Sequence, residues 1–449
     1  MYTALWIRRI AWILSLLLLA GCAGFSDSTK TARSALDAGN ATKALELYNK
    51  QLKVDSAEQL PDKVEGDNTL LLLERSMVLQ QLEKYKLSSR DLEVADKQVQ
   101  VLDFSHSTVD DIGKYMFSDS TGPYKAPFYE KLLINTENMI NYLEAGDLNG
   151  ARVEARRLTV MQSFISDHEG EGEALIGPGS YLAGFIFEKS GNAEEALRYY
   201  DEALQFESFQ SLGPVVVRLA AQSSYRTPRI QKVLDAAGSG TPAADASEGS
   251  GELLVLVNHG RVPAKEAKRI PVGLALTYAS GMLSPGNVAR ANELAAQGLV
   301  TWVNYPVLGK ERNPSPPKLT VDGQQQPLEL GLAVDREAVK AWDGARGTLV
   351  ASAITRMITR VVAGQVVRKA SGGGLLGAIL SVGTQATLTA TDVPDTRSWE
   401  TLPARIDIAR LSLPAGKHDV QVLAGQGDRR RTLQLEPGGW AVVNATLLR

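Results

Sequence analysis

The chain has few of the residues that build disulfides, metal centres and reactive sites. Its 449 residues include one cysteine and four histidines. One cysteine cannot form an intrachain disulfide or a cysteine-based zinc site. The histidines stand far apart in the sequence, and no two have the spacing of a helical metal site. We therefore expect no metal ion and no cofactor.

Catalytic motifs and an excess of basic charge are also missing. The sequence has no nucleophile elbow and no phosphate-binding loop, so no catalytic residue is assigned and we expect a non-enzymatic protein. The 48 basic and 51 acidic residues give a net charge of −3, which argues against nucleic acid as a partner. A hydrophobic content of 44% argues against wholesale disorder, and the length suggests two or three domains.

The N-terminus has the composition of a secretory signal. Arg8 and Arg9 precede an apolar run, Ile10 to Ala20, that is too short to cross a bilayer as a helix. The run ends in Leu-Ala-Gly-Cys, which resembles the bacterial lipobox, in which the chain is cut before the cysteine and the thiol is acylated. We predict a signal peptide at 1–21, cleavage between Gly21 and Cys22, and lipidation of Cys22.

A lipid-anchored Cys22 predicts a location at the cell envelope. More than one acyl chain gives stable membrane attachment. By the lipoprotein resemblance, Ala23 is not the aspartate that commonly retains such proteins at the inner membrane. We therefore expect the protein on the periplasmic side of the outer membrane, with the inner membrane as the alternative. Loss of residues 1–21 removes two arginines and changes the net charge to −5.

The N-terminal half carries a repeat of helical hairpins. Residues 181–204 match the tetratricopeptide (TPR) pattern, in which small residues let two antiparallel helices approach and a glycine makes the turn. The signature positions are Gly184, Phe187, Gly191, Ala196, Tyr200 and Ala203. Weaker copies occupy 32–52, 70–96 and 138–158. We predict a TPR-like array over 22–235 with a docking groove, while a generic helical bundle without a groove remains open.

A change of pattern follows residue 235. Residues 236–251 are rich in glycine, serine and alanine, which predicts a flexible linker. Residues 252–449 then alternate as strands do, around a long helical segment from Asp335 to about Lys369. The predicted strands are 252–258, 271–279, 301–308, 318–321, 327–334, 406–413, 417–423, 430–435 and 440–447. The fold class is therefore α+β and multidomain, with a helical hairpin array before an antiparallel β-rich domain containing a long helix.

Residues 344–391 contain no acidic side chain. Within them, 370–391 carry no charge, but several glycines, threonines and a glutamine make this stretch only weakly apolar. We expect helices or a glycine-rich loop packed on the β-domain. Weak contact of 344–391 with anionic lipid, or a membrane span, remain as alternatives.

The stretch 392–403 concentrates charge and one large aromatic residue. Asp395, Arg397 and Trp399 stand just before the last strands. One interpretation is a structural corner in which Arg397 pairs with Asp395 and Trp399 covers the end of the sheet. The other is a partner-contact hot spot, since Trp and Arg are enriched in such spots.

Several of these segments together resemble a family of bacterial outer-membrane lipoproteins with TPR-like helices and a β-rich C-terminal domain. The resemblance is carried by the lipobox and by residues 141–143, 146–147, 151–154, 253–260, 263–265, 395–399 and 402–403. It implies an envelope location and supplies no catalytic residues.

We therefore expect a lipid-anchored scaffold or adaptor that docks envelope proteins. The alternatives are a subunit of a secretion or pore assembly and an enzyme acting on cell-wall material.

Overall fold

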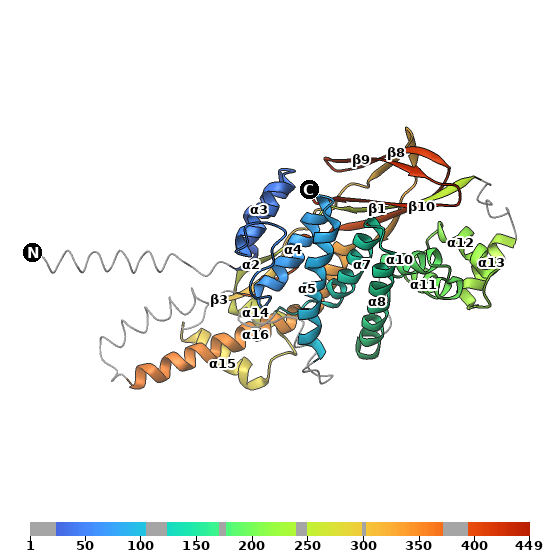
Figure 1. Cartoon of the computed structure of the whole chain (residues 1–449). Coiled ribbons are helices and arrows are strands. Elements are labelled where there is room, and N and C mark those ends of the chain that lie inside the picture. Colours follow the sequence, from blue (N-terminus) through green and yellow to red (C-terminus); the bar gives the residue numbers. More distant parts are fainter. Residues whose placement is uncertain (1–23, 105–123, 170–176, 239–248, 299–301, 371–393) are drawn as a thin grey trace, which may run out of the picture.

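The computed structural model describes residues 24–104, 124–169, 177–238, 249–298, 302–370 and 394–449. It is an α+β structure, as predicted, in which helices fill the N-terminal half and strands dominate the C-terminal half (Figure 1).

The helices of the N-terminal half pair as antiparallel hairpins at the places where the repeats predict them. The pairs are α2 (Phe25–Asp37) with α3 (Ala41–Gln51), α4 (Asp67–Gln81) with α5 (Tyr85–Phe104), α7 (Phe128–Glu144) with α8 (Leu148–Glu169), and α10 (Gly177–Lys189) with α11 (Ala193–Phe206). The helices α12 (Leu212–Ala220) and α13 (Pro228–Gly238) follow them.

The turns of three hairpins share one conformation. Gly39, Gly146 and Gly191 adopt φ values of 77°, 72° and 77°, a region that favours glycine. The side chains of Asn40 and Asn192 then accept the backbone N–H three residues on, which caps α3 and α11. The glycine of the repeat therefore marks the same turn conformation in these three hairpins.

The turn between α4 and α5 shows why residues 70–96 match the repeat poorly. Its turn places Glu83, not glycine, at φ 58°. The turn geometry is kept while the residue that usually marks it is absent.

The predicted linker is structured at both ends. Residues 236–238 belong to α13, and Ser250 and Gly251 begin strand β1. Residues 239–248 lie outside the described part of the chain.

Eight strands of the C-terminal half form two four-stranded sheets. One has the order β10-β1-β7-β6 and the other β5-β4-β8-β9. Their bounds are β1 Ser250–His259, β4 Lys318–Val321, β5 Gln324–Gln326, β6 Glu329–Leu332, β7 Arg405–Pro414, β8 Gly416–Ala424, β9 Gly427–Leu435 and β10 Trp440–Leu447.

The predicted antiparallel pattern has one exception. β1 pairs with β10 in parallel, with Glu252 opposite Trp440, while its other neighbour β7 is antiparallel. The Asp322–Gly323 turn between β4 and β5 has positive φ at both residues, as the hairpin prediction requires.

The first sheet is buried on both faces, which gives the molecule three layers (Figure 1). Leu254 and Leu256 of β1 belong to the hydrophobic core that contains the helices. Leu253, Val255 and Val257 face the second sheet and form a separate core with it. The helical array and the β-domain therefore share one core, because alternate side chains of a strand point to opposite faces.

A projecting arm has its own small core. It consists of β2 (Lys265–Pro271), α14 (Val272–Tyr278), α15 (Pro285–Ala296), β3 (Trp302–Leu308) and α16 (Val334–Ala370). α16 starts in the main core at Val334 and runs outward beside α14 and α15 (Figure 1). Within the described residues, no helix combines the length and the apolar character needed to cross a membrane.

The prediction of a strand at 271–279 is wrong. This segment forms α14, which begins directly after Pro271. Val272, Ala275 and Ala279 are buried in the core of the arm, and their spacing of three and four residues is helical rather than alternating.

Candidate functional site

The segment 395–402 lies inside the molecule, against the helical array. Arg397 donates to both carboxylate oxygens of Asp395, at 2.9 and 2.8 Å, and its backbone oxygen accepts from the Lys265 ammonium at 2.8 Å. Trp399 N–H donates to Glu130 on α7, and Thr401 Oγ1 donates to the carbonyl of Glu74 on α4. The segment therefore connects three parts of the chain.

Two of the three predicted hot-spot residues, Arg397 and Trp399, are buried within this chain, and Asp395 is partly buried. Trp399 has no exposed surface, and Arg397 is 3% exposed. Asp395 and Arg397 form the ion pair of the structural-corner interpretation. The structure therefore favours that corner, because a partner cannot reach Trp399 without displacing helices that already cover it.

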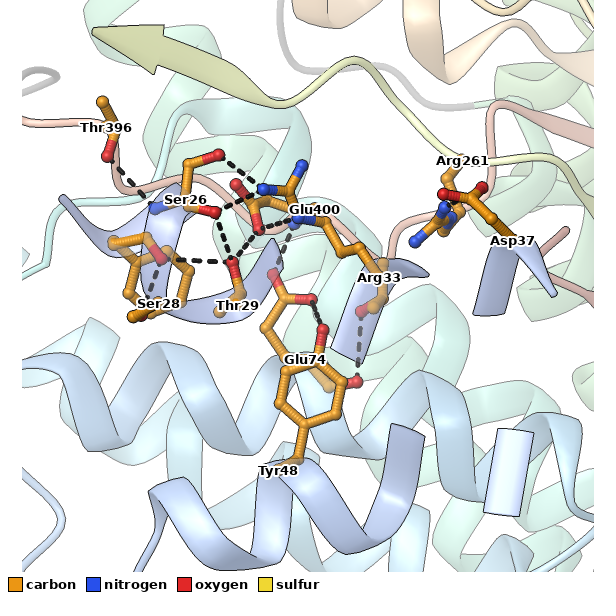
Figure 2. Close-up of polar contacts among 12 residues, drawn as sticks. Ser26, Ser28, Thr29, Arg33, Asp37, Tyr48, Glu74, Arg261, Thr396 and Glu400 are labelled. Atoms are coloured by element: carbon orange, nitrogen blue, oxygen red, sulfur yellow. Dashed lines mark hydrogen bonds and ion pairs between the residues drawn. The ribbon is translucent and has the colours of Figure 1, made fainter. Parts of the chain in front are cut away.

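Helix α2 is fastened to the 395–402 segment (Figure 2). Ser26 N–H donates to Thr396 Oγ1 at 3.2 Å, and Thr29 Oγ1 donates to Glu400 Oε2 at 2.6 Å. Arg33 Nε lies 3.0 Å from the same Glu400 oxygen. The first turns of α2 and a segment some 370 residues later thus form one buried polar cluster.

Glu74 is the second carboxyl group of this cluster. Its Oε1 accepts the backbone N–H of Glu400 at 2.5 Å, and its Oε2 accepts from the Tyr48 hydroxyl at 3.2 Å. Burial, followed by the charge of Glu400, raises the pKa of Glu74 to about 8. Burial also raises the pKa of Glu400, although Arg33 opposes this rise.

Arg261 lies at the edge of the same region and is 1% exposed. Its Nη2 pairs with Asp37 Oδ1 at 2.6 Å, which ties the end of α2 to the chain leaving β1. Burial lowers the pKa of the Arg261 guanidinium, and the nearby Arg312 lowers it further. We name the cluster of Ser26, Thr29, Arg33, Tyr48, Glu74 and Glu400, with Thr396, the N-terminal joint.

Two further polar joints connect the helices to the first sheet. In one, Glu137 of α7 accepts from Asn258 of β1 at 2.7 Å and from Gln80 of α4 at 3.1 Å. Burial raises the pKa of Glu137 to about 7. Asn258 and Gln80 thus provide the hydrogen bonds that water would make to the Glu137 carboxyl group if it were exposed.

The other joint is centred on Arg410 of β7. Arg410 donates to Glu188 of α10 at 2.7 Å and to the Tyr200 hydroxyl of α11 at 2.8 Å. Burial alone would raise the pKa of Glu188, but Arg410 and Lys189 hold it well below its usual range. The guanidinium carbon also lies 5.2 Å from the Phe185 ring centroid. The inner face of the array is therefore occupied by the chain's own sheet.

The six TPR signature positions lie together in the hairpin of α10 and α11. A Cβ on Gly184 would stand 2.5 Å from the Tyr200 ring, so the close approach predicted for this glycine is present. Ala196 and Ala203 are fully buried, and Gly191 makes the turn. Phe187 stacks on Tyr199 rather than on Tyr200.

Other predicted sites fall elsewhere. Gly21 and Cys22 lie outside the described residues, as do 371–391 of the predicted lipid-contacting stretch. Its first part, 344–370, forms the outer portion of α16.

Sequence reasoning missed Glu74, Glu400 and Arg410 as centres of polar joints. One signal was present: Glu74 and Arg75 interrupt the apolar run 70–79. Charged residues in such a run need buried partners, and Arg75 has one in Asp91, at 2.6 Å.

The N-terminal joint can hold protons and fasten elements, but it is closed to a substrate. Glu74 is 0% and Glu400 1% exposed. Within the described residues, no group of three histidine, cysteine or acidic side chains is placed to hold a metal.

Comparison with known proteins does not identify a family for this chain. No protein-family model matches this chain, and a search of curated proteins finds no significant match. The resemblance to lipoproteins with TPR-like helices therefore stays a prediction.

Proposed function

We propose that this protein is a lipid-anchored scaffold of the cell envelope, attached through Cys22 and facing the periplasm from the outer membrane. The observation that carries the proposal is the N-terminal joint, which fastens α2 to the body directly after the predicted anchor. Gly24 lies two positions after Cys22, and two extended residues span at most about 7 Å. An acylated Cys22 would hold the folded body close to the bilayer without a long tether.

Docking of protein partners is the second part of the proposal. The inner face of the array is filled by the first sheet through the Glu137 and Arg410 joints. A partner of the helical array would therefore bind the outer surface of its helices. On α8, the side chains of Val153 and Val160 are exposed. The spacing of seven residues places both on one face of the helix.

The N-terminal joint gives little support to the alternative of a wall enzyme. Such an enzyme needs a carboxyl pair that reaches its substrate. The Glu74 and Glu400 carboxyl groups instead bond to Tyr48, Thr29 and the backbone of the chain itself.

Metabolic labelling tests the anchor. Cells fed an alkyne fatty acid should label the wild-type chain and not Cys22→Ala, and only the wild type should fractionate with outer membranes. Equal labelling of both chains, or none of either, would contradict a lipid on Cys22.

In-cell photocrosslinking tests the docking. A photoreactive residue replaces Val160 on the outer face of α8, and a matched replacement of Leu423 on β8 reports the second sheet. A reproducible protein adduct from Val160 supports helical docking. Absence of adducts at both positions would count against a scaffold.

A further inference from the structure

The arm carries an unusual concentration of exposed apolar side chains. Leu274 and Tyr278 on α14, Met282 just after it and Trp302 on β3 are 41%, 36%, 59% and 46% exposed. Leu274 and Tyr278 are four residues apart and share one helix face. Met282 lies against Gly347 of α16, and Trp302 pairs with Pro271, the residue before α14. We call these four residues the arm patch.

The charge of the arm is opposite to that of the whole chain. Residues 265–298 and 334–370 contain eleven basic and five acidic side chains, a net charge of +6, while the chain as a whole carries −3. The 20 residues 270–289, which include most of the arm patch, have no charge at all. Arg346 lies 5.3 Å from the Tyr278 ring centroid, and Lys268 and Arg269 are exposed on β2.

Strand β2 of the arm and helix α2 are both attached to the 395–402 segment. Lys265, the first residue of β2, donates to the carbonyl of Arg397, while Ser26 of α2 binds the adjacent Thr396. A lipid on Cys22 would therefore lie near the root of the arm. An apolar patch with Trp and Tyr and with basic residues beside it has the composition of interfacial membrane-binding surfaces.

We infer that the arm patch docks on the surface of an anionic phospholipid bilayer and so supplies a second membrane contact beside the lipid anchor. Leu274, Met282 and Trp302 enter the headgroup boundary. Arg269, which shares the strand face of Trp302, and Arg346 meet anionic headgroups. The choice of a lipid occupant rests in part on the proposed anchor at Cys22. The contact itself does not need the acyl chain, so it can be measured without it.

Vesicle co-sedimentation of the mature chain carrying Cys22→Ala tests the inference. We expect binding to vesicles of phosphatidylglycerol and phosphatidylethanolamine, and at least tenfold weaker binding to pure phosphatidylcholine. Arg269→Gln with Arg346→Gln should weaken binding about fivefold for each charge removed, and added salt should also weaken it.

Variants of the arm patch distinguish specific binding by this patch from nonspecific adsorption of exposed apolar side chains. Leu274→Ser, Met282→Ser and Trp302→Ser together should reduce binding at least tenfold. The matched control is Leu60→Ser with Leu330→Ser, which removes exposed apolar side chains outside the arm and should leave binding unchanged. Thermal unfolding of each variant checks that the fold is kept.

Three results would overturn the inference. They are absence of binding to both vesicle types, equal loss of binding in the patch and control variants, and concentration-dependent dimerisation that the patch variant abolishes without any vesicle binding. A failure of fatty-acid labelling at Cys22 would instead remove the proposed anchor and leave the vesicle result standing.

Discussion

Glu74 couples the stability of the N-terminal joint to pH. Its pKa in the folded protein is about 8, against 4.5 for an unperturbed glutamate. Between these values the folded chain holds a proton that the unfolded chain releases. The contribution of Glu74 is therefore fully present below pH 4.5 and is lost as the pH rises through 8.

We predict that Glu74→Gln makes the stability less dependent on pH. Glutamine stays neutral and still accepts the Glu400 N–H. Relative to the wild type, the variant should gain stability from pH 5 to pH 8, on the order of 1 kcal/mol per pH unit. Thermal or urea unfolding across this range measures the effect.

Glu46→Gln is the matched control, because the Glu46 side chain is 60% exposed. The stability of this variant should depend on pH in the same way as that of the wild type. If the stability of Glu74→Gln also has the wild-type pH dependence, Glu74 is ionised in the folded protein and the joint does not hold a proton.

Trp399 is the largest fully buried side chain of the 395–402 segment. We predict that Trp399→Ala lowers the free energy of unfolding by about 3 to 5 kcal/mol, because it leaves a cavity in the shared core. Trp399→Phe should cost about 1 to 2 kcal/mol, since it keeps most of the volume. Urea unfolding gives both values, and similar small losses for both variants would mean that the site is accessible to solvent.

At the scale of elements, the hairpin of α10 and α11 depends on the close approach at Gly184. A Cβ there meets the Tyr200 ring, whose hydroxyl is held by Glu188 and Arg410. We predict that Gly184→Ala destabilises the protein by about 1 to 3 kcal/mol despite the better helix propensity of alanine.

Gly344 provides the control for this substitution. It also lies in a helix, α16, but a Cβ there meets nothing within 4 Å. Gly344→Ala should therefore be neutral or stabilising by up to about 1 kcal/mol. Calorimetric unfolding compares the two, and equal effects would show that packing against Tyr200 does not set the cost.

The hairpins were predictable because their signal is local. Gly39, Gly146 and Gly191 mark turns that are decided within a few residues. α14 was mistaken for a strand because a segment of nine apolar and small residues fits either period, and its packing on α16 decided the outcome. The joints were not predictable, since Glu74 and Glu400 are 326 positions apart.

At the scale of the whole molecule, the helical array and the β-domain form one core. Leu254 and Leu256 of β1 pack in the same cluster as the helices, and the three polar joints cross the same boundary. The structure therefore joins the two predicted domains more closely than a flexible linker would suggest.

We predict that the two halves stay together after the chain is cut between them. A protease site inserted between Gly238 and Gly249 and cleaved in the purified protein should give two fragments that co-elute in size-exclusion chromatography. They should separate only in denaturant and in one cooperative step. Fragments that elute apart in native buffer would show that the shared core does not hold them.

The parallel pairing of β1 with β10 has a consequence for how the chain reaches this state. Glu252 and Trp440 are neighbours in the sheet although 188 positions separate them, and β10 also lies on α4 and α7. The helical hairpins close through local contacts and can form early, whereas the first sheet closes only after a long search through conformational space. Until β10 is seated, the edge of β1 and the apolar side of the helices are open to other chains, which makes this interval the one most exposed to aggregation.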